Sequence, residues 1–122
     1  MSRILIVAFR PHSRQRETVL KLLFAQHLRV VELGLINQRP PWVMEGSNGE
    51  IAYIAAFEGP DQIDRCWQDE AFQDLDSKLL EVADMVPIQS LQEASGAFLD
   101  MEELDVAAIG AMYFAENAPA AE

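Results

Sequence analysis

Cysteine is almost absent from this chain of 122 residues, which contains only Cys66. A single cysteine excludes an internal disulfide framework and is typical of a reducing compartment. Long apolar runs are absent too: none approaches the roughly 20 residues that a membrane-spanning helix needs, and residues 4–9 are too short for the apolar core of a secretory signal. We therefore expect a soluble, cytoplasmic protein that does not interact with membranes.

Basic residues are also scarce, with 9 Lys and Arg against 20 Asp and Glu, and a formal net charge of −11. Binding to a nucleic-acid backbone needs a basic surface, so nucleic acid is excluded as an expected partner. The charge is uneven, because residues 1–39 hold seven of the nine basic residues. With six glycines, six prolines and 50% hydrophobic residues, the composition predicts one folded domain over residues 1–105 and a C-terminal extension over 106–122.

The best-marked catalytic motifs are missing. The chain has no Gly-x-Ser-x-Gly nucleophile elbow, no Gly-x-x-x-x-Gly-Lys phosphate loop and no Gly-x-Gly-x-x-Gly dinucleotide fingerprint. Its two histidines, His12 and His27, have no second ligand residue at metal-binding spacing, so we expect neither a metal nor a cofactor. Cys66 has no general base beside it and is interpreted as a small buried apolar residue. The catalytic residues, if any, stay unknown at this point.

What the chain does have is a succession of strand and helix signals. Residues 4–9 form an unbroken apolar run of strand length, typical of a central strand that is buried on both faces. Apolar residues then recur at helical spacing, which predicts a helix from about residue 13 to Leu33, just before Gly34. The broad apolar arc of this helix indicates contact with more than one neighbour.

The sharpest local signal is the turn at residues 46–49, which contains Asn-Gly between two apolar runs. Asn-Gly supplies the positive φ angles of a tight hairpin, so residues 41–44 and 50–57 are predicted to be paired strands. Pro40 and Pro41 place the first of these strands near a sheet edge, because proline donates no ladder hydrogen bond.

The second half of the chain continues the alternation of helix and strand signals. Proline and aspartate at the start of residues 60–86 predict a second helix, which Pro87 stops. A short turn or helix is expected over residues 88–94, and a last edge strand over 98–104. The apolar stretch 106–114 precedes a frayed Ala, Pro and Glu end.

This order of strand, helix, strand, strand, helix, strand is that of the ferredoxin-like βαββαβ arrangement, an α+β fold with two helices on one face of a four-stranded antiparallel sheet. The other face is predicted to be apolar too and to present roughly 400 Å², which a monomer does not leave exposed without purpose. Two alternatives exist for what covers this second face. A second copy would close a dimeric α+β barrel, or residues 106–114 would fold over the face. We prefer the homodimer.

Several segments resemble a known group of proteins. They are residues 39–41, the strand that opens at Gly49 and ends at Phe57-Glu58, residues 84–94 and residues 98–104. Over residues 3–104 the chain resembles small bacterial proteins of the dimeric α+β barrel superfamily, related in fold to the antibiotic-biosynthesis monooxygenases. The resemblance implies a homodimer with a cavity between sheet and helices, where relatives bind small aromatic or haem-like ligands. The histidine that haem-degrading relatives carry on the second helix is missing from residues 60–86.

Four residues are candidates for lining such a pocket. Trp42 and Trp67 are large rigid aromatics that stack on planar molecules, although burial in a core or a dimer seam is the commoner fate. Tyr53 offers a hydroxyl group. His27 lies on the apolar stripe of the first helix, where a histidine is more often a core residue than a ligand or base.

A second candidate site lies where the first strand leads into the first helix. Arg10, His12, Arg14 and Arg16 gather there, and arginines in a first helical turn oppose the helix dipole unless an anion is held there. The alternative, which we prefer, is that they pair with carboxylates from the rest of the chain.

Together these features predict a homodimer that binds a small apolar or aromatic molecule, with cofactor-independent monooxygenase chemistry as one option. The alternative is a non-catalytic ligand carrier or protein-interaction module. A solvent-open cavity with a titratable group in its wall favours the first, and a solidly filled interior favours the second.

Overall fold

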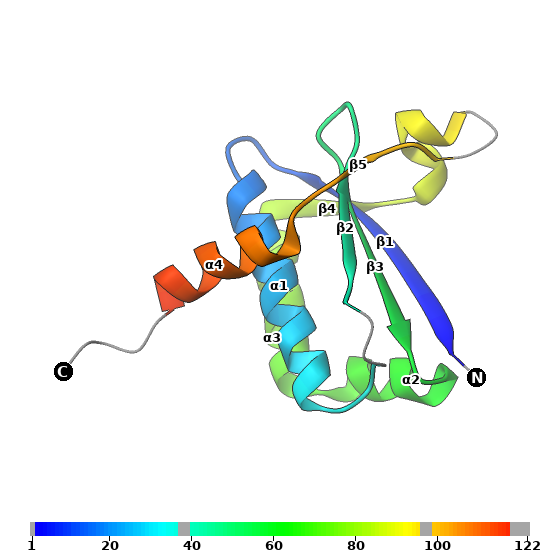
Figure 1. Ribbon diagram of the computed structural model, residues 1–122, viewed down its shortest axis with the longest axis vertical. Coiled ribbons are helices and arrows are strands. Elements are labelled where there is room, and N and C mark those ends of the chain that lie inside the picture. The colour runs from blue at the N-terminus through cyan, green and yellow to red at the C-terminus, as the bar shows by residue number, and fades with distance from the viewer. Residues whose placement is uncertain (1, 37–39, 96–98, 118–122) are drawn as a thin grey trace.

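An antiparallel sheet with helices packed on one of its faces forms the structure (Figure 1). This computed structural model describes residues 2–36, 40–95 and 99–117. The strands are β1 (Arg3–Pro11), β2 (Trp42–Glu45), β3 (Ile51–Phe57), β4 (Ala83–Val86) and β5 (Glu102–Glu103). The helices are α1 (Arg16–Glu32), α2 (Pro60–Gln68), α3 (Glu70–Val82) and α4 (Val106–Asn117), with 3₁₀ turns η1 (Ile88–Ser90) and η2 (Gln92–Ser95). The predicted α+β class is confirmed.

The strand order is β4-β1-β3-β2-β5, and every neighbouring pair is antiparallel. β1 pairs with β3 along seven residues and with β4 at its end, so it lies inside the sheet as predicted. The predicted hairpin is also confirmed. The Gly46 N–H donates to the Glu50 carbonyl at 2.8 Å, and Gly49 adopts a φ of 85°, in the left-handed region that favours glycine.

The prediction of one helix over residues 60–86 is wrong in two places. Asp69 has φ −80° and ψ 125°, which is extended backbone, and it separates α2 from α3. After Val82 the chain becomes β4, whose residues 83–86 pair with residues 8–11 of β1. The helical spacing of apolar residues continues through residues 83–86, so the local sequence favours helix there. Pairing with β1, which is distant in sequence, makes these residues a strand instead.

The last strand also differs from the prediction, and the sheet has five strands rather than four. β5 contains only Glu102 and Glu103 and pairs with the end of β2 at the sheet edge. Phe98, where the predicted strand begins, lies outside the described residues. The short turn or helix expected over residues 88–94 is present as η1 and η2.

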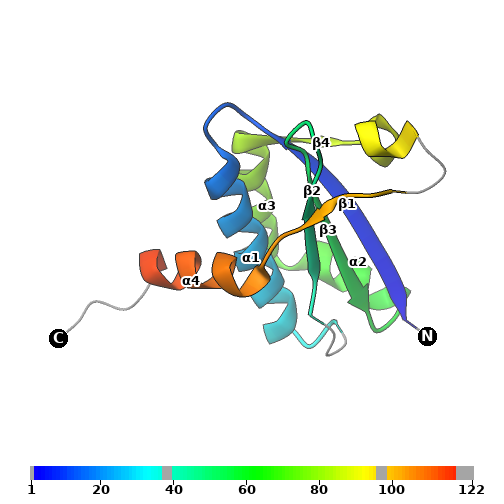
Figure 2. The same cartoon turned by 45° about the horizontal axis from the view of Figure 1, so that its top comes forward.

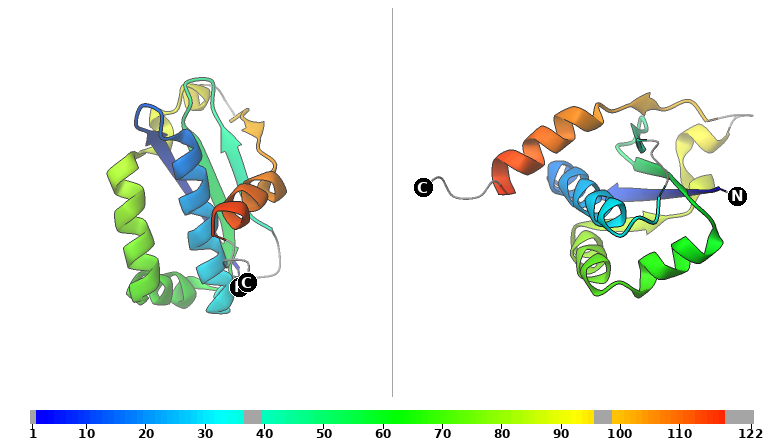
Figure 3. Two further views of the ribbon diagram at one scale, coloured as in Figure 1. Left: turned by 90° about the vertical axis from the view of Figure 1, so that its left-hand side faces the viewer. Right: turned by 60° about the horizontal axis from the view of Figure 1, so that its bottom comes forward.

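The core lies between the sheet and the helices. α1 and α3 run side by side over one face, as both views of Figure 3 show. The buried residues of this core come from β1, β2, β3, β4 and helices α1, α3 and α4: Phe9, Val19, Leu20, Leu23, Val43, Ile51, Leu79, Ala83 and Ile109. Side chains alternate along a strand, so this list identifies the helix-covered face of each strand.

Helix α4 packs against α1, which it crosses in Figure 2. Its Ile109 is 4% exposed and joins the core, and a Cβ on Gly110 would lie 2.8 Å from the Phe24 ring, so glycine permits this close crossing. Lys21 of α1 forms an ion pair with Glu116. The alternative in which residues 106–114 cover the second sheet face is therefore wrong, because these residues extend the helix layer instead.

The second face of the sheet keeps an open apolar surface. The strand register places Ile6, Ile54 and Trp42 in one row across β1, β3 and β2. Trp42 is 58% exposed, and Ile4 and Ile6 are 55% and 45% exposed. We call this row together with Ile4 the outer apolar face. In the described part of the chain nothing covers it.

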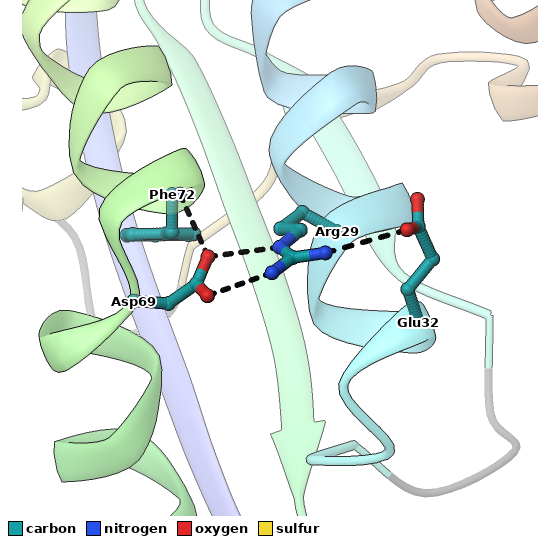
Figure 4. A network of polar contacts seen from close by, with 4 residues as sticks. All are labelled: Arg29, Glu32, Asp69 and Phe72. Atoms are coloured by element: carbon teal, nitrogen blue, oxygen red, sulfur yellow. Dashed lines mark hydrogen bonds and ion pairs between the residues drawn. The ribbon is translucent and has the colours of Figure 1, made fainter.

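One charged contact links α1 to the junction of α2 and α3. Arg29 donates from Nε and Nη2 to the two carboxylate oxygens of Asp69, each at 2.8 Å, and the Phe72 N–H donates to Oδ2 of Asp69 at 2.9 Å (Figure 4). Asp69 thus ends α2, caps α3 and holds both to α1. The hydrogen bonds from Arg29 lower the pKa of Asp69 to about 2.

Replacement of Asp69 tests this junction. Asparagine keeps an oxygen that caps α3 but loses the charge, whereas alanine loses both, so the melting temperature is expected to fall in the order wild type, D69N, D69A. The charge contribution is present above pH 3.8 and is lost as the pH falls toward 2. Thermal unfolding followed by circular dichroism measures both effects. Asp74→Ala, on the exposed side of α3, is the control, and equal melting of D69A and wild type would contradict the assignment.

Candidate functional site

A cavity lies between the helix-covered face of the sheet and helices α1, α2 and α3. Strand residues that line it are Leu5, Val7, Phe9, Tyr53, Phe57 and Met85. The helices add the apolar Leu23, Val30, Ile63, Trp67 and Phe72, and the polar Gln26, Cys66 and Asp76. Its water-accessible interior measures about 30 Å³, room for one or two water molecules, and the empty space including open solvent at the mouth is about 490 Å³. The walls are almost entirely apolar.

The mouth of the cavity is marked by its two most exposed lining residues. Trp67 is 41% exposed and Met85 is 47% exposed, whereas Phe72 is buried. The Trp67 and Phe72 rings meet edge to face, with centroids 5.2 Å apart. A molecule that enters the cavity therefore passes an aromatic pair and a flexible thioether, both of which adapt to an apolar guest.

Two of the predicted pocket residues meet in the wall. The Tyr53 hydroxyl and Nδ1 of His27 are 2.7 Å apart in a hydrogen bond. Tyr53 lines this cavity and also a smaller one beneath α4, of which His27 is a wall residue. Burial lowers the pKa of His27 to about 4 and raises that of Tyr53. At neutral pH both side chains are therefore uncharged.

Cys66 also faces the cavity, and its thiol is protonated. It is 2% exposed, and burial, followed by the nearby carboxylates of Asp69 and Asp76, raises its pKa to about 12. A thiol held in this state is a poor nucleophile. The interpretation of Cys66 as a small buried residue agrees with these surroundings.

Gln26 and Asp76 are wall residues that the sequence analysis missed. Nε2 of Gln26, which is 7% exposed, donates a long hydrogen bond of 3.5 Å to Oδ1 of Asp76. A signal for each exists in the helical spacing. Gln26 stands three residues after Leu23 on the buried side of α1, and Asp76 stands four residues after Phe72 and so shares its side of α3. The sequence analysis examined neither residue as a site candidate.

Of the predicted pocket residues, the structure brings Tyr53 and Trp67 to the cavity between the sheet and the helices, and His27 to the smaller cavity beneath α4. Trp42 reaches neither of these two cavities and lines instead an open hollow beside Glu103 and Val106. Trp42 belongs to the outer apolar face, because the strand register turns it away from the core side of β2.

Three of the four basic candidates each contact a different carboxylate. Arg10 contacts the buried Glu50 at 3.2 Å, and His12 contacts Asp84 at 3.1 Å. Arg16 donates to both oxygens of Glu45, at 2.7 and 2.9 Å. Arg14 is exposed and has no ion partner among the described residues. Pairing of Arg10, His12 and Arg16 with carboxylates from later in the chain, rather than a shared anion site, is what this geometry favours.

No potential metal site is found among the described residues, since no three His, Cys, Asp or Glu side chains come together there. No helix in that part of the chain has both the length and the apolar character needed to cross a membrane. Comparison with models of protein families, with curated proteins and with solved structures finds no significant match to the chain. The site is therefore interpreted from its own geometry.

The buried His27 predicts a pH-dependent stability. Its pKa in the folded state, about 4, lies below the usual histidine value of 6.5, so the unfolded chain binds a proton that the folded chain does not. Stability is then complete above pH 6.5 and falls by about 3 kcal/mol as the pH decreases to 4. Urea unfolding between pH 7.5 and 4.5 measures this loss. His27→Gln is expected to flatten the profile, and an equally steep profile in H27Q would contradict the prediction.

Proposed function

We propose that this protein binds a small, largely apolar or aromatic molecule in the cavity between the sheet and helices α1, α2 and α3, and that it does so as a homodimer. The observation that carries the proposal is a cavity with apolar walls, an aromatic mouth and a few hydrogen-bonding groups. This composition is typical of small-molecule sites, in which apolar area supplies affinity and a few polar groups set orientation. The ligand widens the narrow interior by displacing Trp67 and Met85, which are half-exposed.

Binding, rather than acid–base or nucleophilic catalysis, is favoured by the protonation states in the wall. A general base needs a pKa near neutrality, and the pKa of His27 is lowered to about 4. The pKa of the Cys66 thiol is raised to about 12, so the thiol stays protonated at neutral pH. A carrier or a ligand-responsive module fits these states. Cofactor-independent monooxygenase chemistry would depend on a substrate that supplies the reactivity itself, and its signature is dioxygen consumption when ligand and protein are mixed.

The ferredoxin-like arrangement and the dimeric barrel are part of the proposal. They are supported by the strand order β4-β1-β3-β2, with α1 and α3 on one face and β5 and α4 added to it. The homodimer is supported by the outer apolar face. A second copy on this face would bury Ile4, Ile6 and Trp42, which are 45–58% exposed in the subunit, and burial of apolar surface favours association.

The two tryptophans allow ligand binding to be tested separately from association. In the Trp42→Phe variant the remaining Trp67 reports on the cavity, and in Trp67→Phe the remaining Trp42 reports on the outer apolar face. A thermal-shift screen of small aromatic molecules is expected to yield compounds that raise the melting temperature and change the emission of W42F but not that of W67F. The proposal fails if no compound stabilises the protein, or if only Trp42 responds.

Association is tested by placing a charge on the outer apolar face. The wild type is expected to sediment at micromolar concentration with twice the subunit mass of 13.7 kDa. Ile6→Glu is expected to sediment as a monomer, because Ile6 is already 45% exposed in the subunit and a charge there harms only the interface. Val31→Glu is the matched control, since Val31 is 50% exposed on α1, and it is expected to stay dimeric. A monomeric wild type would overturn the homodimer.

A further inference from the structure

We infer that the cavity selects ligands that carry a protonated amine, with Asp76 as the group that receives it. The inference rests on the proposed function and narrows it to one chemical class: a small aromatic or alkyl body with a primary ammonium group. It starts from the charges of the cavity wall. Of the fourteen lining residues, Asp76 is the only one with a carboxylate, and none is Lys or Arg.

Asp76 lacks a cationic partner within the described residues. Its one hydrogen bond comes from Nε2 of Gln26 and is long, at 3.5 Å. Other carboxylates that face helix α1 are occupied: Asp69 by Arg29 and Glu45 by Arg16, each through two short bonds. An ammonium group has three donors and matches the unfilled acceptor sites that Asp76 retains.

The neighbours of Asp76 favour a cation as well. Phe72 precedes it by one helical turn on α3, and Trp67 packs edge to face on Phe72 at the mouth. Aromatic faces attract ammonium groups, Trp most strongly. The body of the ligand would then extend past these rings to the apolar strand residues.

Charge also argues against the other ligand classes. An anion would meet Asp76 with no basic side chain in the wall to compensate, and it would approach a chain of net charge −11. A neutral molecule would fill the apolar space but leave the carboxylate without an ion partner. Asp76 is only partly buried, so an ammonium ion loses only part of its hydration when it pairs there.

Three probes of similar size and different charge test the inference: 2-phenylethylamine, 2-phenylethanol and 3-phenylpropionate. Each is titrated into the W42F protein, and the emission of Trp67 gives the dissociation constant. The amine is expected to bind most tightly and the carboxylate most weakly. Asp76→Asn, which keeps the shape of the side chain, is expected to weaken amine binding about tenfold and to leave alcohol binding unchanged.

The matched control is Asp74→Asn in the same background. It removes the same charge from the same helix at an exposed position, so amine binding is expected to stay within twofold of the parent. If the alcohol binds as tightly as the amine and D76N changes neither, the inference is overturned while the proposed cavity function stands. If D74N and D76N weaken the amine equally, general charge rather than Asp76 is responsible, which also overturns the inference. If Trp67 responds to none of the probes, the proposed function fails together with the inference.

Discussion

The sheet of this protein is apolar on both faces, and the helices of the chain cover only one of them. The covered face receives α1, α3 and, through Ile109, the C-terminal helix α4. The other face keeps Ile4, Ile6 and Trp42 about half exposed. Burial of apolar surface is the main force that holds a domain of this size together. The arrangement of the helix layer, the position of the cavity and the proposed second subunit all follow from this division between the two faces.

The helices do not fill the space over the covered face completely, and the walls of the remaining cavity are almost entirely apolar. Burial keeps Tyr53 and Cys66 in the cavity wall uncharged at neutral pH, as it does His27, which contacts Tyr53 from the smaller cavity. The wall is therefore apolar in effect even where polar atoms face it. Asp76 is the exception. No other charged side chain lines this wall, so the Asp76 carboxylate has more influence on which ligand enters than an exposed carboxylate elsewhere on this acidic chain.

Local signals in the sequence were sufficient for part of this structure. The apolar run of β1, the spacing in α1 and the Asn-Gly turn each depend on neighbours in the chain, and each prediction is confirmed. β4 was missed because strand pairing joins residues that are far apart in sequence, and because the apolar spacing of α3 continues into β4. β5 lies within the predicted edge strand 98–104 but is limited to residues 102–103. The break at Asp69 depends on one residue whose partner, Arg29, is 40 positions away. Of the pocket candidates, Tyr53 and Trp67 reach the cavity between the sheet and the helices and Trp42 does not, since the face on which a strand residue lies depends on register.

The central claim is that the outer apolar face is covered by a second copy of the chain while the helix side keeps the cavity. Quenching of Trp42 by acrylamide in the W67F variant, measured from micromolar to nanomolar protein, tests this claim most directly. The account predicts a shielded Trp42 at high concentration that becomes open to the quencher on dilution. The same high quenching at every concentration, in folded protein, would contradict it.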